Sequence, residues 1–173
     1  LKGKKNKFNK NYEPKYNDWT DHLTTLFPQI RLKQYLEIRS MDACSWNEIC
    51  APAAFWTGIL YDEISFEETY ELIKEWSHEE RLYFNKNVAI DALNASYKDK
   101  NLLDISKKLL SISHNGLERR NNLSTNKEYN ETFYLKEIDE NLKQGISPAD
   151  NLLKKYNIDW NKSLDKIYEE FIF

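Results

Sequence analysis

Residues 102–120 read LLDISKKLLSISHNGLERR, and this stretch does most to decide the fold class. Its apolar side chains recur every three or four residues, as they do along one face of an α-helix. The recurring positions are Leu102, Ile105, Leu109 and Ile112, followed by Gly116. Arg119 and Arg120 come at the end, where positive charge is favourable near the carboxyl end of a helix. The stretch therefore predicts the longest helix of the chain.

Three Ser-x-x-Glu patterns upstream predict further helix starts, at Ser45, Ser65 and Ser77. In this capping box, the serine and glutamate side chains accept hydrogen bonds from amide groups that the first turn leaves unpaired. The helix that starts at Ser65 is expected to bury one apolar stripe, made of Phe66, Tyr70, Ile73 and Trp76.

Downstream of the long helix, loop and helix signals alternate. The Asn-rich residues 121–131 predict a loop. A helix over 133–143 is expected to end at Gly145, and Ser147 followed by Pro148 predicts the start of another helix. A last helix is expected over 163–171.

The amino-terminal side of the chain predicts a strand. A short helix that begins near Asp18 is expected to end at Pro28, because proline cannot continue a helix. Residues 30–39 then read IRLKQYLEIR and alternate with a period of two, which is typical of one continuous strand. Its apolar face carries Leu32, Leu36 and Ile38. Its polar face carries Arg31, Lys33, Tyr35, Glu37 and Arg39.

Together these patterns predict a mainly α fold with a small β element. A content of 40% hydrophobic and 14% aromatic residues is enough for one globular core. Residues 1–16 are rich in lysine and asparagine and are expected to form a basic linker or loop. The body then covers 17–173, with a strand at 30–39 and a helical remainder at 45–173. No change in composition marks a second domain.

Charge and composition exclude several functions. Six lysines and Glu13 give residues 1–16 a net charge of +5, so the total of −3 leaves −8 for the remainder. An acidic body does not favour nucleic-acid binding, which needs a clustered basic face. The longest apolar stretch, near 51–60, is too short to span a membrane. The first residue is Leu1, so we expect the chain to begin within a longer polypeptide.

The polar face of 30–39 holds the residues best suited to chemistry. A carboxylate such as Glu37 supplies the hard oxygen that Mg²⁺ prefers, and arginine offers a planar fork of donors that matches phosphate or carboxylate oxygens. The alternative is a solvated surface strand whose charges pair with neighbouring strands or with water. The pattern of charges leaves both interpretations open.

Longer runs of sequence carry a resemblance to a known family. The runs are DWTDHLTTLFP at 18–28, RLK at 31–33, YLEIRSMD at 35–42, CAPAAFWTGILYD at 50–62, GLERR at 116–120, SPADNLL at 147–153 and YEEFIF at 168–173. In order and approximate spacing they resemble glutamate–cysteine ligases of the plant and proteobacterial type. The chain departs from the family pattern at Gln34, where arginine is usual, and in the loop at 40–46.

The resemblance implies an α+β fold like that of glutamine synthetase, of which this chain would be the carboxyl-terminal, mostly helical part. It implies ATP-dependent joining of the γ-carboxylate of L-glutamate to L-cysteine, the first step of glutathione biosynthesis. ATP and Mg²⁺ are then expected in the complete enzyme, without full binding to this fragment. The expected partners are the three small substrates, the missing amino-terminal half and, through self-association, further copies of the chain.

Roles for single residues follow from the same resemblance. It implies that Glu37 is a Mg²⁺ ligand and that Arg39 stabilises the transferring phosphoryl group or holds a substrate carboxylate. Arg31 and Lys33 are further catalytic candidates. The candidates for substrate binding are His22, Thr24, Thr25 and Tyr35. His22 could equally be a packing residue, because histidine on a short amphipathic helix often is.

Two alternatives to this function stay open. The chain could be a stand-alone helical interaction domain that recruits a partner through its strand, or part of a γ-glutamyl ligase with another amine acceptor. A cytoplasmic location is expected, since the two cysteines, Cys44 and Cys50, cannot form a disulfide framework. We expect both to be unreactive thiols.

Overall fold

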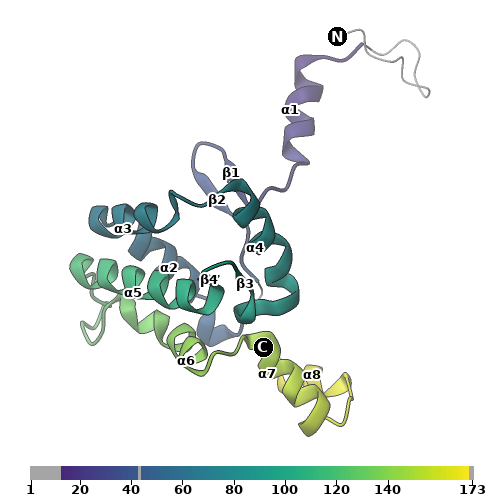
Figure 1. Cartoon of the computed structure of the whole chain (residues 1–173), viewed down its shortest axis with the longest axis vertical. Helices are drawn as coiled ribbons and strands as arrows, with labels where there is room; N and C mark the ends of the chain where they lie inside the picture. Colours follow the sequence, from purple (N-terminus) through teal and green to yellow (C-terminus); the bar gives the residue numbers. More distant parts are fainter. Residues whose placement is uncertain (1–12, 43, 172–173) are drawn as a thin grey trace. The chain divides into compact units, whose positions relative to one another are not determined.

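The computed structural model describes residues 13–42 and 44–171 (Figure 1). The chain divides into two compact units, Leu1–Ala43 and Cys44–Phe173, although the composition signals no second domain. Most of the predicted basic linker, residues 1–12, lies outside the described residues. The boundary predicted after residue 16 stays a prediction.

In its described residues, 13–42, the first unit contains one helix and one β-hairpin. Helix α1 spans Tyr16–Thr24, and strands β1 (Ile30–Leu32) and β2 (Leu36–Ile38) pair antiparallel. The prediction of one continuous strand over 30–39 was therefore wrong. Residues 33–35 make a tight turn, in which the Lys33 amide donates to the Tyr35 carbonyl at 2.9 Å. The two short strands pair their backbone groups with each other, which a single isolated strand cannot do.

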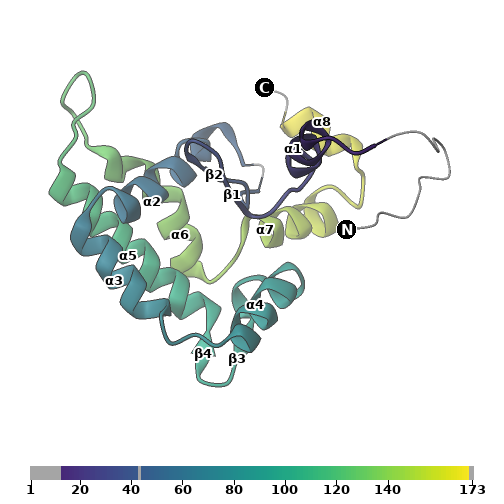
Figure 2. The same cartoon turned by 90° about the horizontal axis from the view of Figure 1, so that it is seen from above.

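The second unit is mostly helical, with one further short hairpin. Helices α2, α3 and α5 lie against one another, and Figure 2 shows them from above. Its longer helices are α2 (Ala51–Leu60), α3 (Glu63–Ile73), α4 (His78–Asp91), α5 (Leu102–Arg120), α6 (Lys136–Gln144), α7 (Pro148–Lys154) and α8 (Asp165–Glu170). Its short elements are η1 (Trp46–Glu48), η2 (Ala92–Asn94), η3 (Glu131–Leu135), η4 (Lys155–Asp159), β3 (Ser96–Tyr97) and β4 (Lys100–Asn101). In the part of the chain that the structure describes, no helix is long and apolar enough to cross a membrane.

Most of the helix signals are confirmed. The long helix predicted over 102–120 is α5, with the same bounds. Ser77 and Ser147 cap α4 and α7 with complete capping boxes. Ser45 caps η1, which is one short turn of 3-10 helix. Gly145 ends α6 in the left-handed region at φ 69°, which glycine adopts without strain. The mainly α class with a small β element is therefore confirmed.

Ser65 does not start a helix, contrary to the prediction. Helix α3 begins at Glu63, because Asp62, three residues before Ser65, accepts a hydrogen bond from the Ser65 amide at 2.8 Å and acts as the N-cap. The Ser65 side chain is fully buried, and its hydroxyl donates to the Ile112 carbonyl of α5 at 2.9 Å. The serine thus serves the contact between α3 and α5.

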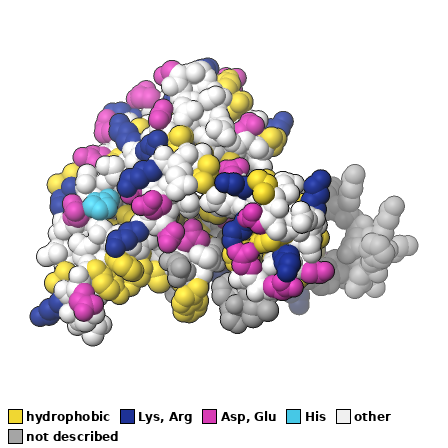
Figure 3. Space-filling view, turned by 90° about the horizontal axis from the view of Figure 1, so that it is seen from below, with side chains coloured by type: hydrophobic (Ala, Val, Ile, Leu, Met, Phe, Trp, Pro, Cys, Tyr) yellow, Lys and Arg dark blue, Asp and Glu magenta, His cyan; other side chains and the backbone are white. Residues whose placement is uncertain are grey.

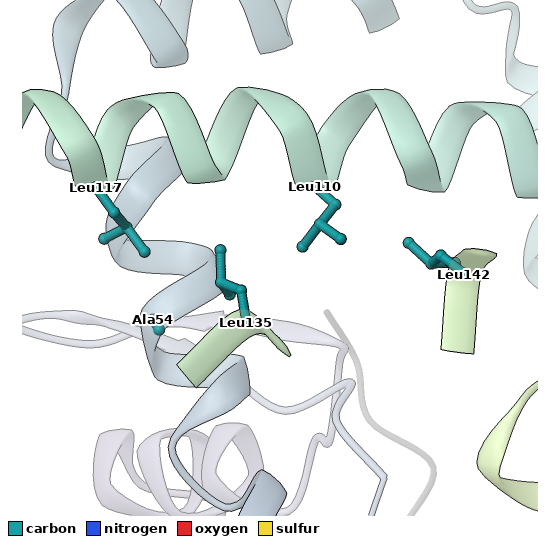
Figure 4. Close-up of a cluster of buried hydrophobic side chains, with 5 residues drawn as sticks. All are labelled: Ala54, Leu110, Leu117, Leu135 and Leu142. Atoms are coloured by element: carbon teal, nitrogen blue, oxygen red, sulfur yellow. The ribbon is translucent and has the colours of Figure 1, made fainter. Parts of the chain in front are cut away.

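The core of the second unit forms beneath α5. Figure 4 shows Leu110 and Leu117 projecting from α5 toward Leu135 of η3, with Ala54 of α2 and Leu142 of α6 at the edges. Leu117 and Leu135 are at most 2% exposed. Each leucine buried in this way contributes about 1.5–3 kcal/mol to folding. The α5 members of this core, Leu110 and Leu117, lie beside the predicted stripe, of which only Ile112 and Gly116 are buried.

Helices α2 and α5 cross at very short range through two glycines. A Cβ atom on Gly116 would lie 2.0 Å from the Gly58 carbonyl oxygen, and one on Gly58 would lie 2.2 Å from the Ser113 carbonyl oxygen. The Ser113 hydroxyl donates to the Phe55 carbonyl at 2.8 Å across the same crossing. The absence of side chains at both glycines is therefore what allows the two backbones to approach.

An ion pair fastens the entry of α3 to the end of α5. Arg119 donates to both carboxylate oxygens of Asp62, with Nη2 at 2.6 Å from Oδ1 and Nε at 3.0 Å from Oδ2. This hydrogen bond from Arg119 lowers the pKa of Asp62 well below its ordinary value, although partial desolvation opposes the shift. Asp62 therefore stays ionised and anchors two helices.

Three of the four residues in the apolar stripe predicted for α3 are exposed. Phe66, Tyr70 and Ile73 are 49%, 54% and 41% exposed, so the expectation that they are buried was wrong. The fourth residue, Trp76, lies beyond the end of α3 and is half-buried, with its ring 5.4 Å from the ring of Phe84. The opposite face of α3, with the small Ser65, packs against α5 instead. Figure 3 shows hydrophobic side chains in several patches among charged ones on one face of the molecule. Exposed apolar stripes of this kind are typical of interaction surfaces.

A buried carboxylate ties α4 to the hairpin of β3 and β4. Glu80 is 6% exposed and accepts from the Lys100 ammonium at 2.8 Å and from the Ser77 amide at 2.7 Å. The hydrogen bond from Lys100 is the main cause that lowers the pKa of Glu80 from 4.5 to about 2.

We expect this carboxylate to make stability depend on pH. A carboxyl group with a lowered pKa in the folded state stabilises the protein above its unfolded pKa, and this contribution is lost as the pH falls from 4.5 to about 2. Glu80→Gln is therefore expected to flatten the decline of the melting temperature in that range. The exposed Glu137, changed to Gln, is the control. Equal slopes for both variants would contradict the assignment.

Candidate functional site

The β-hairpin of the first unit brings three charged side chains together. Arg31 lies directly opposite Glu37 in the antiparallel register, and Arg39 follows two residues later. Arg31 Nε donates to Glu37 Oε2 at 2.7 Å, and Arg39 Nη1 donates to Glu37 Oε1 at 2.9 Å. The three-residue turn preserves the alternation of faces, so these side chains still share a face. We call Arg31, Glu37 and Arg39 the arginine clamp.

The clamp is held against the chain that leads into the hairpin. The Arg39 guanidinium carbon lies 4.7 Å from the centroid of the Phe27 ring, and that of Arg31 lies 5.9 Å from it. Arg31 also donates, at 3.3 Å, to the carbonyl oxygen of Thr24, which is the last residue of α1. Contacts between a cation and a ring face contribute about 0.5–1 kcal/mol at exposed sites. Both arginines are therefore restricted in orientation.

The electrostatics of the clamp favour an anionic ligand. Two guanidinium groups face one carboxylate, so the clamp carries a net positive charge. The hydrogen bond from Arg31 is the main cause that lowers the pKa of Glu37, and Arg39 adds to the shift. Glu37 therefore stays ionised at neutral pH. Arg31 gives a further donor to the Thr24 carbonyl oxygen, and the remaining guanidinium donors match the geometry of phosphate or carboxylate oxygens.

The other predicted site residues lie outside the clamp. Lys33 and Tyr35 are in the turn of the hairpin, and both are exposed. Thr24 and Thr25 donate their hydroxyls to the carbonyls of Asp21 and His22, at 2.7 Å each, which completes the end of α1.

Phe27 lies beside the clamp, whereas His22 lies beside Trp19 on α1. The His22 ring is exposed and lies 5.9 Å from the ring of Trp19. Sequence reasoning missed Phe27 as the partner of the arginines. Its place directly before Pro28 and the hairpin was the available signal, but the ring reaches both arginines only because the chain reverses.

The described residues do not form a complete metal site. Both Glu37 oxygens already accept hydrogen bonds from arginine, and a nearby cation opposes the binding of another. Within 13–42 and 44–171, no group of three or more His, Cys, Asp or Glu side chains is arranged to hold a metal ion. A Mg²⁺ ion at Glu37 would need oxygen ligands from elsewhere, so this role stays a prediction.

Comparison with known proteins identifies the family. Residues 3–170 match the family described as glutamate-cysteine ligase family 2 (GCS2). This match covers most of the chain, which therefore belongs to that family. The resemblance seen in the sequence motifs is confirmed.

The similar proteins are plant enzymes. The chain is 38% identical over 160 residues to glutamate–cysteine ligase A, chloroplastic, of Oryza sativa subsp. indica, and 38% identical to glutamate–cysteine ligase, chloroplastic, of Arabidopsis thaliana. It is 39% identical to the protein of the same name from Solanum lycopersicum. Each match covers 92% of this chain but only 29–31% of the relative. The chain thus spans less than a third of the length of these relatives.

Proposed function

We propose that the chain is the part of a glutamate–cysteine ligase that follows its main catalytic sheet, and that the complete enzyme joins the γ-carboxylate of L-glutamate to the amine of L-cysteine. The reaction would use ATP and would begin glutathione biosynthesis. The family match over residues 3–170 is the observation that carries this proposal. We further propose the α+β fold of glutamine synthetase for the complete protein.

Within that enzyme, we assign the arginine clamp to an anionic part of the substrates. Activation of the γ-carboxylate by ATP creates and moves negative charge on phosphate oxygens, and donors fixed in advance stabilise such charge most effectively. Glu37 accepts from both Arg31 and Arg39 and so would hold the two forks in place. Lys33, Tyr35 and His22 stay candidates for substrate contact from a more exposed position.

The exposed apolar surface of α3 supports the proposal that the chain is part of a larger protein. Phe66, Tyr70 and Ile73 leave an apolar stripe on α3 that another part of the enzyme, or a second copy, would cover. The missing part of the enzyme is the partner that we propose first. The cytoplasmic location stays a prediction, which fluorescence imaging of the tagged complete protein would check.

An assay of the complete enzyme tests the proposed reaction. ADP release is expected to require both glutamate and cysteine, and γ-glutamylcysteine is expected as the product. A preference for another amine would instead identify a different γ-glutamyl ligase, and no ADP release with any amine would contradict the proposal.

The 173-residue chain alone is expected to be inactive. Phosphoryl transfer requires a nucleotide pocket and several metal ligands, and the described residues hold one arginine clamp and no metal cluster. Product formation is measured by chromatography with the complete enzyme as the positive control. Sustained γ-glutamylcysteine formation by the purified chain would refute this expectation.

A further inference from the structure

A cleft in the second unit lies between α5, η3 and α6. Its volume is about 480 Å³, which suits a small organic molecule. The cleft wall includes Leu110, Leu135 and Leu142, which are 6%, 2% and 7% exposed and belong to the core. Part of the cleft is therefore apolar and firmly supported from beneath.

The rim of the cleft is basic. Lys107, Lys136 and Lys143 line it together with one carboxylate, Asp139, which gives these four side chains a net formal charge of +2. Lys143 pairs with Asp139 at 2.5 Å, and the Lys136 ammonium lies 4.5 Å from the centroid of the Phe133 ring. Among the described residues, no carboxylate forms an ion pair with Lys107. At least one ammonium group is thus available to a ligand.

The other side of α5 has the opposite charge. A groove between α3 and α5 is lined by Glu63, Glu67, Glu68 and Glu71, with Lys108 on its α5 side. The basic cleft is thus a local feature of a chain whose overall charge is −3. Neighbouring lysines on one helix, Lys107 and Lys108, face different surroundings.

We propose that the cleft between α5 and α6 binds a small amphipathic anion: a carboxylate-bearing molecule with a short aliphatic body. The lysines of the rim attract the carboxylate, and the aliphatic part lies on the leucines of the wall. Each methylene group removed from water there strengthens binding about fourfold. The cleft shares no residue with the arginine clamp, and this proposal does not rest on the proposed ligase reaction.

Titration of the ¹⁵N-labelled 173-residue chain, followed by NMR, tests the site with three probes. Hexanoate is expected to shift amide signals of α5, η3 and α6 and to bind about sixteenfold more tightly than acetate, if two of its four additional methylene groups are removed from water. Pentylammonium has the same aliphatic chain but the opposite charge, and we expect it to leave these signals unchanged. Added salt should weaken hexanoate binding, since the lysines are at the surface. Equal affinity for acetate and hexanoate, or equal shifts with pentylammonium, would overturn the proposal.

Lysine variants test which ammonium groups attract the carboxylate of the ligand. Lys107→Gln is expected to weaken hexanoate binding about threefold, and the double variant with Lys143→Gln about tenfold. Lys108→Gln removes the same charge from the next residue of α5, but on the acidic groove, and should leave the affinity unchanged. These lysines are on the surface, so the fold should survive in every variant. Identical affinities for Lys107→Gln and the parent chain would place the ligand elsewhere and refute the site.

Discussion

Gly116→Ala is expected to destabilise the second unit by at least about 3 kcal/mol, which is near the upper end of the usual cost of adding atoms to a packed core. The new methyl group would lie 2.0 Å from the Gly58 carbonyl oxygen and 2.7 Å from the Ser65 hydroxyl. The first neighbour is backbone within α2, which cannot rotate away as the end of a flexible side chain can. Helices α2 and α5 would have to separate, and the core beneath them would open. Thermal and urea unfolding, followed by circular dichroism, measures the loss.

The sign of the effect makes this prediction specific. In the interior of an exposed helix, replacing glycine by alanine stabilises by about 1 kcal/mol. The neighbouring Asn115 is exposed on the same helix, and Asn115→Ala is expected to stabilise slightly because alanine is the better helix former. If Gly116→Ala raised the melting temperature as Asn115→Ala should, the close crossing of α2 and α5 would be disproved.

Local signals predicted those helices whose ends are set by nearby residues. Ser77 caps α4 through an amide three residues away, and Gly145 ends α6 through its own backbone conformation. The Ser65 pattern is also local, but it predicted a helix start that does not form. The Ser65 hydroxyl instead donates to the Ile112 carbonyl, 47 residues later in the chain. A short-range motif cannot reveal a partner that only the packing of α3 on α5 provides.

The prediction that the apolar stripe of α3 is buried failed for a related reason. A period of three to four residues shows that Phe66, Tyr70 and Ile73 share a face, but not what that face contacts. In this chain the buried face is the one with the small Ser65, because a small residue lets α3 approach α5 closely. The aromatic face is left exposed, as it would be in a protein that continues beyond this chain.

The candidate site was predictable in part. Alternation along 30–39 placed Arg31, Glu37 and Arg39 on one face, and a turn of three residues keeps that relation in the hairpin. The same turn separates Lys33 and Tyr35 from the group, which alternation could not show. The direct pairing of Arg31 with Glu37, and the contact of both arginines with Phe27, depend on the reversal of the chain.

The largest effect on activity is expected at the arginine clamp in the complete enzyme. Arg39→Lys keeps the positive charge but loses the planar fork, which both Glu37 and the Phe27 ring contact. Removing one charge-stabilising group that is fixed in advance typically lowers the rate by about 10²–10³. Steady-state kinetics and thermal melting of each variant separate catalysis from folding. Leu36→Ala, on the other face of the hairpin, is the control, and nearly normal activity per folded molecule is expected because Leu36 is 59% exposed and is not part of the clamp.

Glu37→Gln distinguishes two roles for the carboxylate. The amide keeps the size of the side chain but removes the anion that Arg31 and Arg39 share, so both forks should lose their alignment. A loss of about 10²–10³ that persists at high Mg²⁺ would assign Glu37 to positioning the arginines. Partial recovery at high Mg²⁺ would assign it to the metal, as the family resemblance predicts. If Glu37→Gln acts through the arginines, combining it with Arg39→Lys should cost less than the sum of the two single effects, because both changes disrupt the same interaction. Near-normal turnover in both single variants would show that the clamp is a solvated surface pair, and the assignment of the site to this hairpin would then be wrong.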